Sequence, residues 1–497
     1  MMKSRPQQSA RRRLLPVLLV VCALVVAMGV ARAQADRNAR VNVPGKTAST
    51  TLPDMPRIAY TRFVLPNGLA VVLHEDHSAP IVAIHLDYHV GSKDEVPGKR
   101  GLAHVFEHMM FEGSANVAPG EHAKIIRSAG GSFNAYTQND QTAYWEIVPS
   151  NLLETTLWLE ADRMAFLPAR LDSERFERAR EAVQNEYALN AQDPRTGLLA
   201  AEAFVGALFP DPSPYATLSM GVMAELKTTT VDDLRAFFNR YYAPNNATLA
   251  IAGDLTAGEA RKMVERYFGG IPRGAAVTHP AVSASPLVRE TRLVLEQKTA
   301  NTLQLWVGWR AASTADPDRM ALTALNGILT RGRTSRLSRA LVDDRKLATG
   351  LPPGGSGNFD LERGGIFQII VSPNPNSPMT DVETVIDSVV AAVRDNGVSP
   401  EELRRWATSF TVSSTTRLQQ IYNRDSLLVE GQMFQHDPSV LFGDVAAARK
   451  LTPADLQRVA RKYLGPGRVV LSVVPAGKLE LRSKPSEPFI NKTRTSP

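Results

Sequence analysis

The chain has 497 residues, with 57 basic and 50 acidic side chains, a formal net charge of +7 and a single cysteine. This length is enough for two or more domains with complete cores. The first 33 residues carry six basic residues and no acid, so the rest of the chain has a net charge of only +1. A body this close to neutral gives no electrostatic reason to expect nucleic-acid binding.

The first segment, 1–33, has the pattern of a secretory signal peptide. It has a basic start that includes Arg11-Arg12, an apolar run over 14–30 and a small-x-small site at 31–33. The alternative is a membrane anchor, but the apolar run is short for a span. Cys22 lies inside this segment, so the mature chain would have no disulfide although it enters an oxidising compartment. We therefore expect a periplasmic or secreted protein without stable membrane insertion, exported by a Gram-negative-type signal, with Sec and twin-arginine export both open.

Strand signals begin after a polar leader at 34–56. Two short apolar runs flank Asn67-Gly68, which is typical of a tight hairpin turn. Apolar and polar residues then alternate over 81–90, which predicts a half-buried strand. His85 and His89 lie on its polar face, and a strand holds them too far apart to chelate a metal readily.

The most informative motif is His104-x-x-Glu107-His108. On a helix these positions share one face, so two imidazoles can reach one ion and a carboxylate can reach a water beside it. This order of residues is the inverzincin motif of zinc peptidases. The alternative is a solvated helical face. Apolar residues at 101–103 and 109–111 instead favour an interior position, where unpaired polar groups are costly and a bound cation would remove that cost.

Downstream of the motif the patterns predict a helix at 121–129, a strand through 133–148, and helices at 151–165 and 173–189. A zinc centre needs a third protein donor. The last of these helices offers several acids, and the sequence alone leaves the choice among them open: Glu174, Glu177, Glu181 and Glu186.

The chain also contains a long internal repeat. The segment 230–244 resembles 452–466 at an offset of 222 residues, and an apolar strand follows each, at 247–252 and 469–474. A repeat of this length indicates duplicated domains. Only the first copy carries the His-x-x-Glu-His motif.

These patterns predict the following organisation along the chain. It consists of a signal peptide at 1–33, a flexible leader at 34–56, an N-terminal catalytic zinc domain at 57–272, a linker at 273–290, a C-terminal homologous non-catalytic domain at 291–477 and a polar tail at 478–497.

Several motifs together resemble the pitrilysin–insulysin family of zinc peptidases. They span almost the whole mature chain and are more specific in its first half. The arrangement is similar to bacterial two-domain members and to mitochondrial processing peptidase subunits. The matching residues are Gly68-Leu69, 101–104, 107–109, Phe111, Gly113, 134–137, Thr142, Tyr144, 183–186, Tyr215, Gly221, Tyr242, 244–246 and Gly253-Asp254.

The resemblance implies a fold and a metal centre. The fold would be two similar α/β-sandwich domains, each a mostly antiparallel sheet with helices packed on one side, forming half of a clamshell. One Zn²⁺ per chain would be ligated by His104, His108 and Glu186. Glu107 would be the general base that takes a proton from the zinc-bound water, which attacks a peptide carbonyl.

The same resemblance implies how substrate binds. A peptide would add as a strand beside 133–137, where main-chain pairing gives affinity with little sequence choice. Asn134, Ala135 and Thr137 would form this substrate-binding strand. Tyr136, Trp145 and Phe166 are expected in the core rather than in a substrate pocket.

Two features depart from the family pattern. Many members carry a second Glu seven residues before the third ligand, and here that position is Ala179, which leaves Glu181 as a candidate to orient a ligand. Many members also place an Arg and a Tyr in the second half to grip the substrate carbonyl, but the expected positions are Val342 and Thr349. This absence predicts a heterodimer with a paralogue that lacks the zinc motif but keeps the Arg and Tyr, with a homodimer as the alternative.

The expected function is that of a zinc metalloendopeptidase acting on peptides or unfolded segments. A processing enzyme with one dedicated peptide differs only in substrate breadth. The alternative from another class is a non-catalytic assembly or chaperone-like subunit of a peptidase-family complex. The intact motif argues against that alternative.

Overall fold

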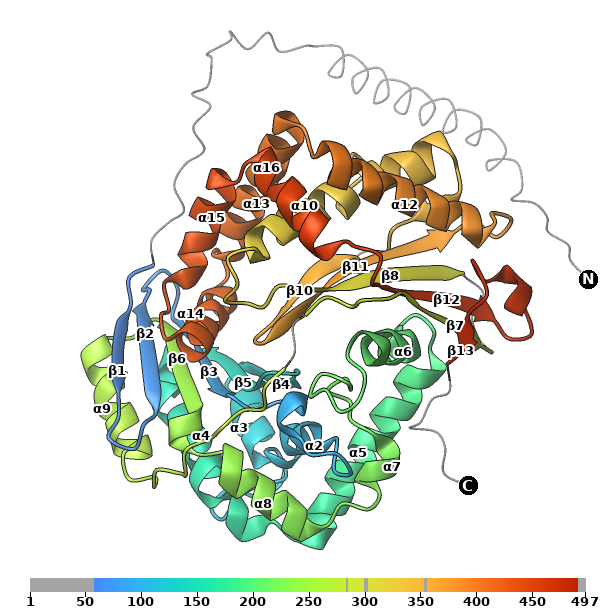
Figure 1. Cartoon of the computed structure of the whole chain (residues 1–497). Coiled ribbons are helices and arrows are strands. Elements are labelled where there is room, and N and C mark those ends of the chain that lie inside the picture. The colour runs from blue at the N-terminus through green and yellow to red at the C-terminus, as the bar shows by residue number, and fades with distance from the viewer. Residues whose placement is uncertain (1–57, 283–284, 299–302, 353–354, 490–497) are drawn as a thin grey trace, which may run out of the picture. The chain divides into compact units, whose positions relative to one another are not determined.

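The computed structural model describes residues 58–282, 285–298, 303–352 and 355–489 (Figure 1). The predicted signal peptide and leader lie outside the described residues, as do residues 490–497 of the predicted tail. Among the residues described, no helix combines the length and the apolar character that crossing a membrane requires.

The first domain is built on a six-stranded sheet in the order β1-β2-β6-β3-β5-β4. Every neighbouring pair is antiparallel except β2 and β6, which run parallel. The strand β4 lies at an edge of the sheet and pairs with β5 alone. The strands are β1 (Thr61–Val64), β2 (Ala70–Glu75), β3 (Ile81–Tyr88), β4 (Ser132–Thr137), β5 (Thr142–Pro149) and β6 (Ala247–Gly253).

Eight helices accompany this sheet, and α2 follows β3 along the chain. They are α2 (Leu102–Met109), α3 (Glu121–Ser128), α4 (Leu153–Phe166), α5 (Ser173–Gln192), α6 (Leu198–Leu208), α7 (Met223–Leu226), α8 (Val231–Tyr241) and α9 (Ala257–Phe268).

The second domain repeats the same strand order. Its sheet runs β10-β11-β8-β12-β7-β13, in which the first five strands match β4-β5-β3-β6-β2, and β12 and β7 are parallel as β6 and β2 are. The sixth strand differs, because β13 comes last in the chain and runs parallel to β7, whereas β1 comes first and runs antiparallel to β2. The strands are β7 (Thr291–Gln297), β8 (Gln304–Ala311), β9 (Ala348–Gly350), β10 (Gly357–Leu361), β11 (Gly364–Pro373), β12 (Val469–Pro475) and β13 (Glu487–Pro488). The predicted polar tail is therefore structured in part, because β13 pairs with β7.

The helices of the second domain follow the same plan, with α10 after β8 as α2 follows β3. They are α10 (Arg319–Thr330), α11 (Arg336–Ser338), α12 (Met379–Asn396), α13 (Pro400–Arg417), α14 (Ile421–Gln435), α15 (Val440–Lys450) and α16 (Pro453–Tyr463), with a π-helical turn at Arg339–Asp344. The prediction of two similar α/β domains with mostly antiparallel sheets is thus confirmed, while the domain boundaries stay a prediction.

One helix of each domain packs on the sheet of the other domain. Helix α6 of the first domain packs on β7, β8 and β12, and α14 of the second packs on β2, β3 and β6 (Figure 1). The contact at α6 is so close that a Cβ on Gly308 would lie 2.3 Å from the ring of Phe204. Helices of both domains therefore cover each sheet, in addition to the one-sided packing that the sequence predicts.

The structure corrects three predictions, and the exchange of helices explains the first. The strand at 81–90 is not half-buried: His85 and Asp87 are both fully buried, because α14 covers the face on which they lie. The predicted strand over 133–148 is a hairpin, with β4 and β5 joined by a turn in which Gln138 N donates to Gln141 O at 2.8 Å. Phe166 is also wrongly predicted to be core, since it is 48% exposed.

Candidate metal centre

Helix α2 carries the His-x-x-Glu-His motif and is fixed from several sides. Phe106 is fully buried, and its ring lies against those of Tyr242 and Phe238. The hydroxyl of Tyr144, on β5, donates to the carbonyl of Phe106 at 3.1 Å. The apolar face of the helix is thereby held in the core while the opposite face carries the motif.

The N-terminus of α2 is held by Glu95. Both carboxylate oxygens accept backbone N–H groups, from Gly101 at 2.8 Å and from Ala103 at 2.7 Å. Gly101 is the N-cap residue of α2, and its φ of +117° favours glycine. A glycine has no side chain with which to cap the helix. Burial raises the pKa of Glu95, and the two backbone N–H groups oppose this rise by stabilising the ionised carboxylate. A distant carboxylate therefore replaces the usual capping residue and fixes the start of the helix.

Helix α5 carries Glu186, the third predicted ligand, and brings it toward α2. It begins at an N-cap formed by Asp172, whose carboxylate accepts from Arg175 N at 2.9 Å. Its buried face includes Val183 and Tyr187, and the helix packs against α2. Glu186 lies on the turn between these two residues.

The three predicted ligands converge. Glu186 Oε2 lies 3.5 Å from His104 Nε2 and 3.6 Å from His108 Nε2, and the ligand atoms all lie within 4.8 Å of one another. The facing imidazoles of His104 and His108 hold the pKa of the Glu186 carboxyl well below its usual range. Glu107 lies on the same turn of α2 and is partly exposed.

The other acids of α5 are engaged elsewhere. Glu174 forms an ion pair with Arg178 at 2.8 Å, and Glu177 pairs with Arg180. Glu181 is exposed. The geometry thus selects Glu186 from the four candidates that the sequence left open.

The donor set fits a zinc ion. His108 Nε2 is buried and has no hydrogen-bond partner in the described part of the chain, although it points at the Glu186 carboxylate. Two imidazole nitrogens and one carboxylate oxygen are the three protein ligands of many catalytic zinc sites, which keep a further position open. The side chains are 8%, 30% and 42% exposed for His104, His108 and Glu186, so the centre is closed on one side and open on the other.

No side chain among the described residues orients His104 through a hydrogen bond to its second ring nitrogen. Its Nδ1 is buried without a hydrogen-bond partner among the described residues. Ala179 is buried in the core, and the exposed position of Glu181 does not support it as the residue that orients a ligand.

The predicted substrate strand lies beside the start of α2. Asn134 is exposed on β4, Ala135 is buried, and Thr137 Oγ1 lies 3.5 Å from the carbonyl of Ala103. Because β5 is the only strand among the described residues that pairs with β4, the outer edge of β4 presents backbone groups for a further strand.

A second group of possible metal ligands occurs among the described residues, formed by His122, Glu146 and Glu160. Arg163 contacts both carboxylates, at 3.3 Å from Glu146 and in a closer ion pair with Glu160. The guanidinium already supplies the positive charge that these buried acids need, so this group is part of the core and not a second metal centre.

The sequence reasoning missed Glu95. Its position six residues before Gly101 matches no capping pattern, since those patterns place the capping side chain next to the helix. The one available signal was an acid in the short segment before a helix whose N-cap residue is a glycine.

Comparison with known proteins gives the class to which the fold and centre belong. Residues 70–207 match the family described as insulinase (peptidase family M16), and residues 228–409 match the family's domain described as the peptidase M16 inactive domain. The first of these two domains contains the complete His-x-x-Glu-His motif, and the second does not. The chain belongs to the M16 family of peptidases, also called the pitrilysin–insulysin family.

Two curated relatives are described as zinc proteases. The chain is 27% identical over 404 residues to zinc protease PqqE of Helicobacter pylori, covering 80% of this chain and 89% of that protein. It is 30% identical over 312 residues to an uncharacterized zinc protease of Rickettsia bellii, covering 62% and 72%.

Solved structures show the same fold. A protease from Helicobacter pylori superposes with a TM-score of 0.77 at 24% identity, covering 84% of this chain and all of that chain. The periplasmic protease PqqL from Escherichia coli superposes with a TM-score of 0.69 at 18% identity, covering 88% of this chain but 52% of that chain.

Proposed function

We propose that the chain is a zinc metalloendopeptidase that hydrolyses peptides or unfolded segments. The observation that carries this proposal is the convergence of His104, His108 and Glu186 from two separate helices, with Glu107 on the same face of α2. The relatives described as zinc proteases support it.

Each residue has a separate role in this proposal. His104, His108 and Glu186 would hold the ion, which when bound supplies a Lewis acid toward a water molecule and the peptide carbonyl. Glu107 takes the proton of the attacking water and later gives it to the leaving amine. Glu95 keeps α2 in place, so that Glu107 and the two histidines keep their relative positions.

Substrate would add as a strand to the free edge of β4. Backbone pairing orients the peptide along β4 next to α2, and the exposed amide of Asn134 adds a contact to its main chain. Ala135 and Thr137 would complete this strand, with Thr137 close to the start of α2.

We also propose that the active form contains a second half from another chain. The Arg and Tyr expected near Val342 and Thr349 are absent. PqqL is about twice as long as the part that this chain matches, and the first half of PqqL superposes on this chain with a TM-score of 0.67. A paralogue without the zinc motif would supply the missing half. A homodimer is the second possibility. Either assembly would act in the periplasm.

The test is a peptide-cleavage assay on the purified chain, alone and together with a paralogue from the same genome that carries the Arg–Tyr pair. The expected result is metal-dependent cleavage that rises when the paralogue is added. Normal turnover by a homodimer contradicts the heterodimer. A chain that binds zinc but cleaves no peptide in either setting points to the non-catalytic assembly subunit instead.

A further inference from the structure

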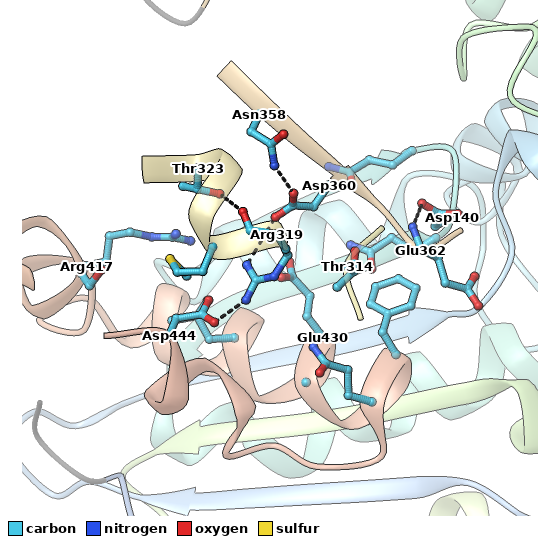
Figure 2. A pocket seen from close by; sticks show the side chains of 18 of the residues that line it. Asp140, Thr314, Arg319, Thr323, Asn358, Asp360, Glu362, Arg417, Glu430 and Asp444 are labelled. Carbon is cyan, nitrogen blue, oxygen red and sulfur yellow. Dashed lines mark hydrogen bonds and ion pairs between the residues drawn. The ribbon is translucent and has the colours of Figure 1, made fainter. Parts of the chain in front are cut away.

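Two cavities flank the turn at 138–141, which follows β4 directly. The first, shown in Figure 2, has a volume of about 350 Å³ and is lined from α10, α13, α14 and α15. The charges at its centre are paired: Arg319 pairs with Asp360 and Asp444, and Asn358 donates to Asp360 at 2.6 Å. The centre of this cavity therefore offers a ligand no unpaired charge.

The second cavity is larger and mostly apolar. It has a volume of about 800 Å³ and lies between α6 and the sheet of the second domain. Ala201 and Val205 of α6 form one wall, and Trp306, Phe359 and Ile366 of the sheet form the other. The cavity is thus built by both domains.

The polar side chains at its boundary are used within the protein. Asn139 donates to Ser92 Oγ at 3.0 Å, Asp140 accepts from the hydroxyl of Tyr215 at 2.7 Å, and Gln368 donates to the carbonyl of Gly355 at 2.6 Å. Arg195 also lines the cavity and pairs with Asp193, and the rest of the lining is mostly apolar. Phe359 is 41% exposed there, which is unusual for a large aromatic side chain.

The cavity begins where the proposed substrate strand ends. Thr137 lies beside Ala103, the residue before His104, and Gln138 is the next residue and already lines the cavity. A strand advances about 3.3 Å per residue. A peptide paired with β4 therefore passes from the metal centre to the mouth of the cavity within a few residues.

We infer that this cavity is a substrate subsite that takes a large apolar side chain, aromatic or branched aliphatic, located two to four residues from the scissile bond. The inference rests on the proposed peptidase function. It assigns to the second domain, which lacks the metal motif, a share in choosing the substrate. A large apolar side chain gains burial against this lining, and a short polar side chain such as Ser does not.

Two variants test the subsite from opposite directions. Ala201→Phe places a ring in the cavity, and Phe359→Ala removes an exposed ring from its wall with little expected effect on folding. Two matched controls make the same changes elsewhere: Ser414→Phe in the polar cavity of Figure 2, and Leu479→Ala at another exposed apolar side chain.

The first measurement is kcat/KM on a positional peptide library, with cleavage sites read by mass spectrometry. The chain should prefer Phe or Leu over Ser about ten-fold or more at one position within four residues of the cleaved bond. Ala201→Phe should reduce that preference to two-fold or less, and Phe359→Ala should weaken it. Both controls should leave it unchanged. A preference that is absent, or equal in all variants, overturns the subsite.

The second measurement separates the subsite from catalysis. Glu107→Gln protein is titrated with fluorescent peptides that differ only by Phe or Ser at that position, with and without Ala201→Phe, or at each position in turn if no cleavage is seen. A Phe preference in binding that Ala201→Phe removes supports the subsite even if no cleavage is seen, in which case the proposed peptidase function fails alone. Cleavage by the unmodified chain together with equal binding of both peptides overturns the subsite and leaves the peptidase function standing.

Discussion

In each domain an equivalent helix follows an equivalent strand, α2 after β3 and α10 after β8, but the polar side chains of the two helices have different partners. In α2 the Nε2 atoms of both motif histidines face the Glu186 carboxylate, and among the described residues that of His108 has no hydrogen-bond partner. The repeat offset of 222 residues places Asn326 and Thr330 of α10 at the positions of His104 and His108. There Asn326 donates to the carbonyl of Gln368 at 3.1 Å, and Thr330 donates to Asn326 Oδ1 at 2.8 Å. One copy leaves its polar atoms for a ligand, and the other uses them within the fold.

The two helices that pack on the sheet of the opposite domain, α6 and α14, also differ in how polar they are. Helix α6 is rich in apolar residues and lies on the second sheet beside the apolar cavity. Helix α14 brings Asp425 and Glu430 onto the first sheet, where Asp425 lies 3.0 Å from His85. The sheet of the first domain therefore buries titratable groups of α14, Asp425 among them, whereas the wall that α6 contributes to the cavity is apolar.

The largest expected effect concerns Glu107. Glu107→Gln removes the group that accepts the proton, so kcat should fall about 10²–10⁴-fold while zinc stays bound. Kinetics and metal analysis measure the two quantities separately. Glu112→Gln is the control, since Glu112 follows α2 but pairs with Arg178. Full activity of the Glu107 variant with zinc bound contradicts its assignment as the base.

A smaller effect is expected from the cap of α2. Glu95→Gln turns an amide donor toward one of the two backbone N–H groups, so the helix start loosens and zinc affinity should fall about 10–100-fold. Competition with a fluorescent chelator measures this affinity. Glu121→Gln is the matched control, because Glu121 also accepts a backbone N–H, from Ala118, at the start of α3. Equal zinc affinity in both variants contradicts the positioning role of Glu95.

The buried acids under α14 predict a pH dependence of stability. Burial raises the pKa of Asp87 to about 8, with Glu430 and Asp425 adding to the rise and His85 opposing it. Below about pH 4 both folded and unfolded states bind the proton. As the pH rises toward 8 only the folded state keeps it, so the free energy of unfolding falls.

Asp87→Asn removes this penalty. The variant should be more stable than the wild-type chain by roughly 1–3 kcal/mol near pH 7 and no more stable near pH 4. Urea unfolding at a series of pH values measures the difference. A stability difference that is the same at every pH contradicts the explanation.

The smallest effect is expected in the second domain. Thr330→Val leaves Asn326 Oδ1 without its donor and should lower the free energy of unfolding by about 1 kcal/mol. Zinc content and kcat should not change. A change in zinc binding would contradict the contrast between α2 and α10.

Local patterns predicted much of this molecule, and long-range contacts account for the rest. The spacing of the motif was enough to place three side chains on one face of α2, and the repeat was enough to predict two similar domains. The choice of Glu186 needed the family resemblance, because only the crossing of α5 and α2 distinguishes it from Glu181. The burial of His85 and Asp87 depends on α14, more than 300 residues away along the chain.

The zinc content of Glu186→Ala, compared with Glu181→Ala, tests the central claim most directly. Both changes remove a carboxylate from the same helix, but only Glu186 faces the two imidazoles. The account predicts one zinc per chain in the wild-type protein and in Glu181→Ala, and loss of zinc in Glu186→Ala with an unchanged circular dichroism spectrum. Zinc held equally well by both variants would contradict the proposed metal centre.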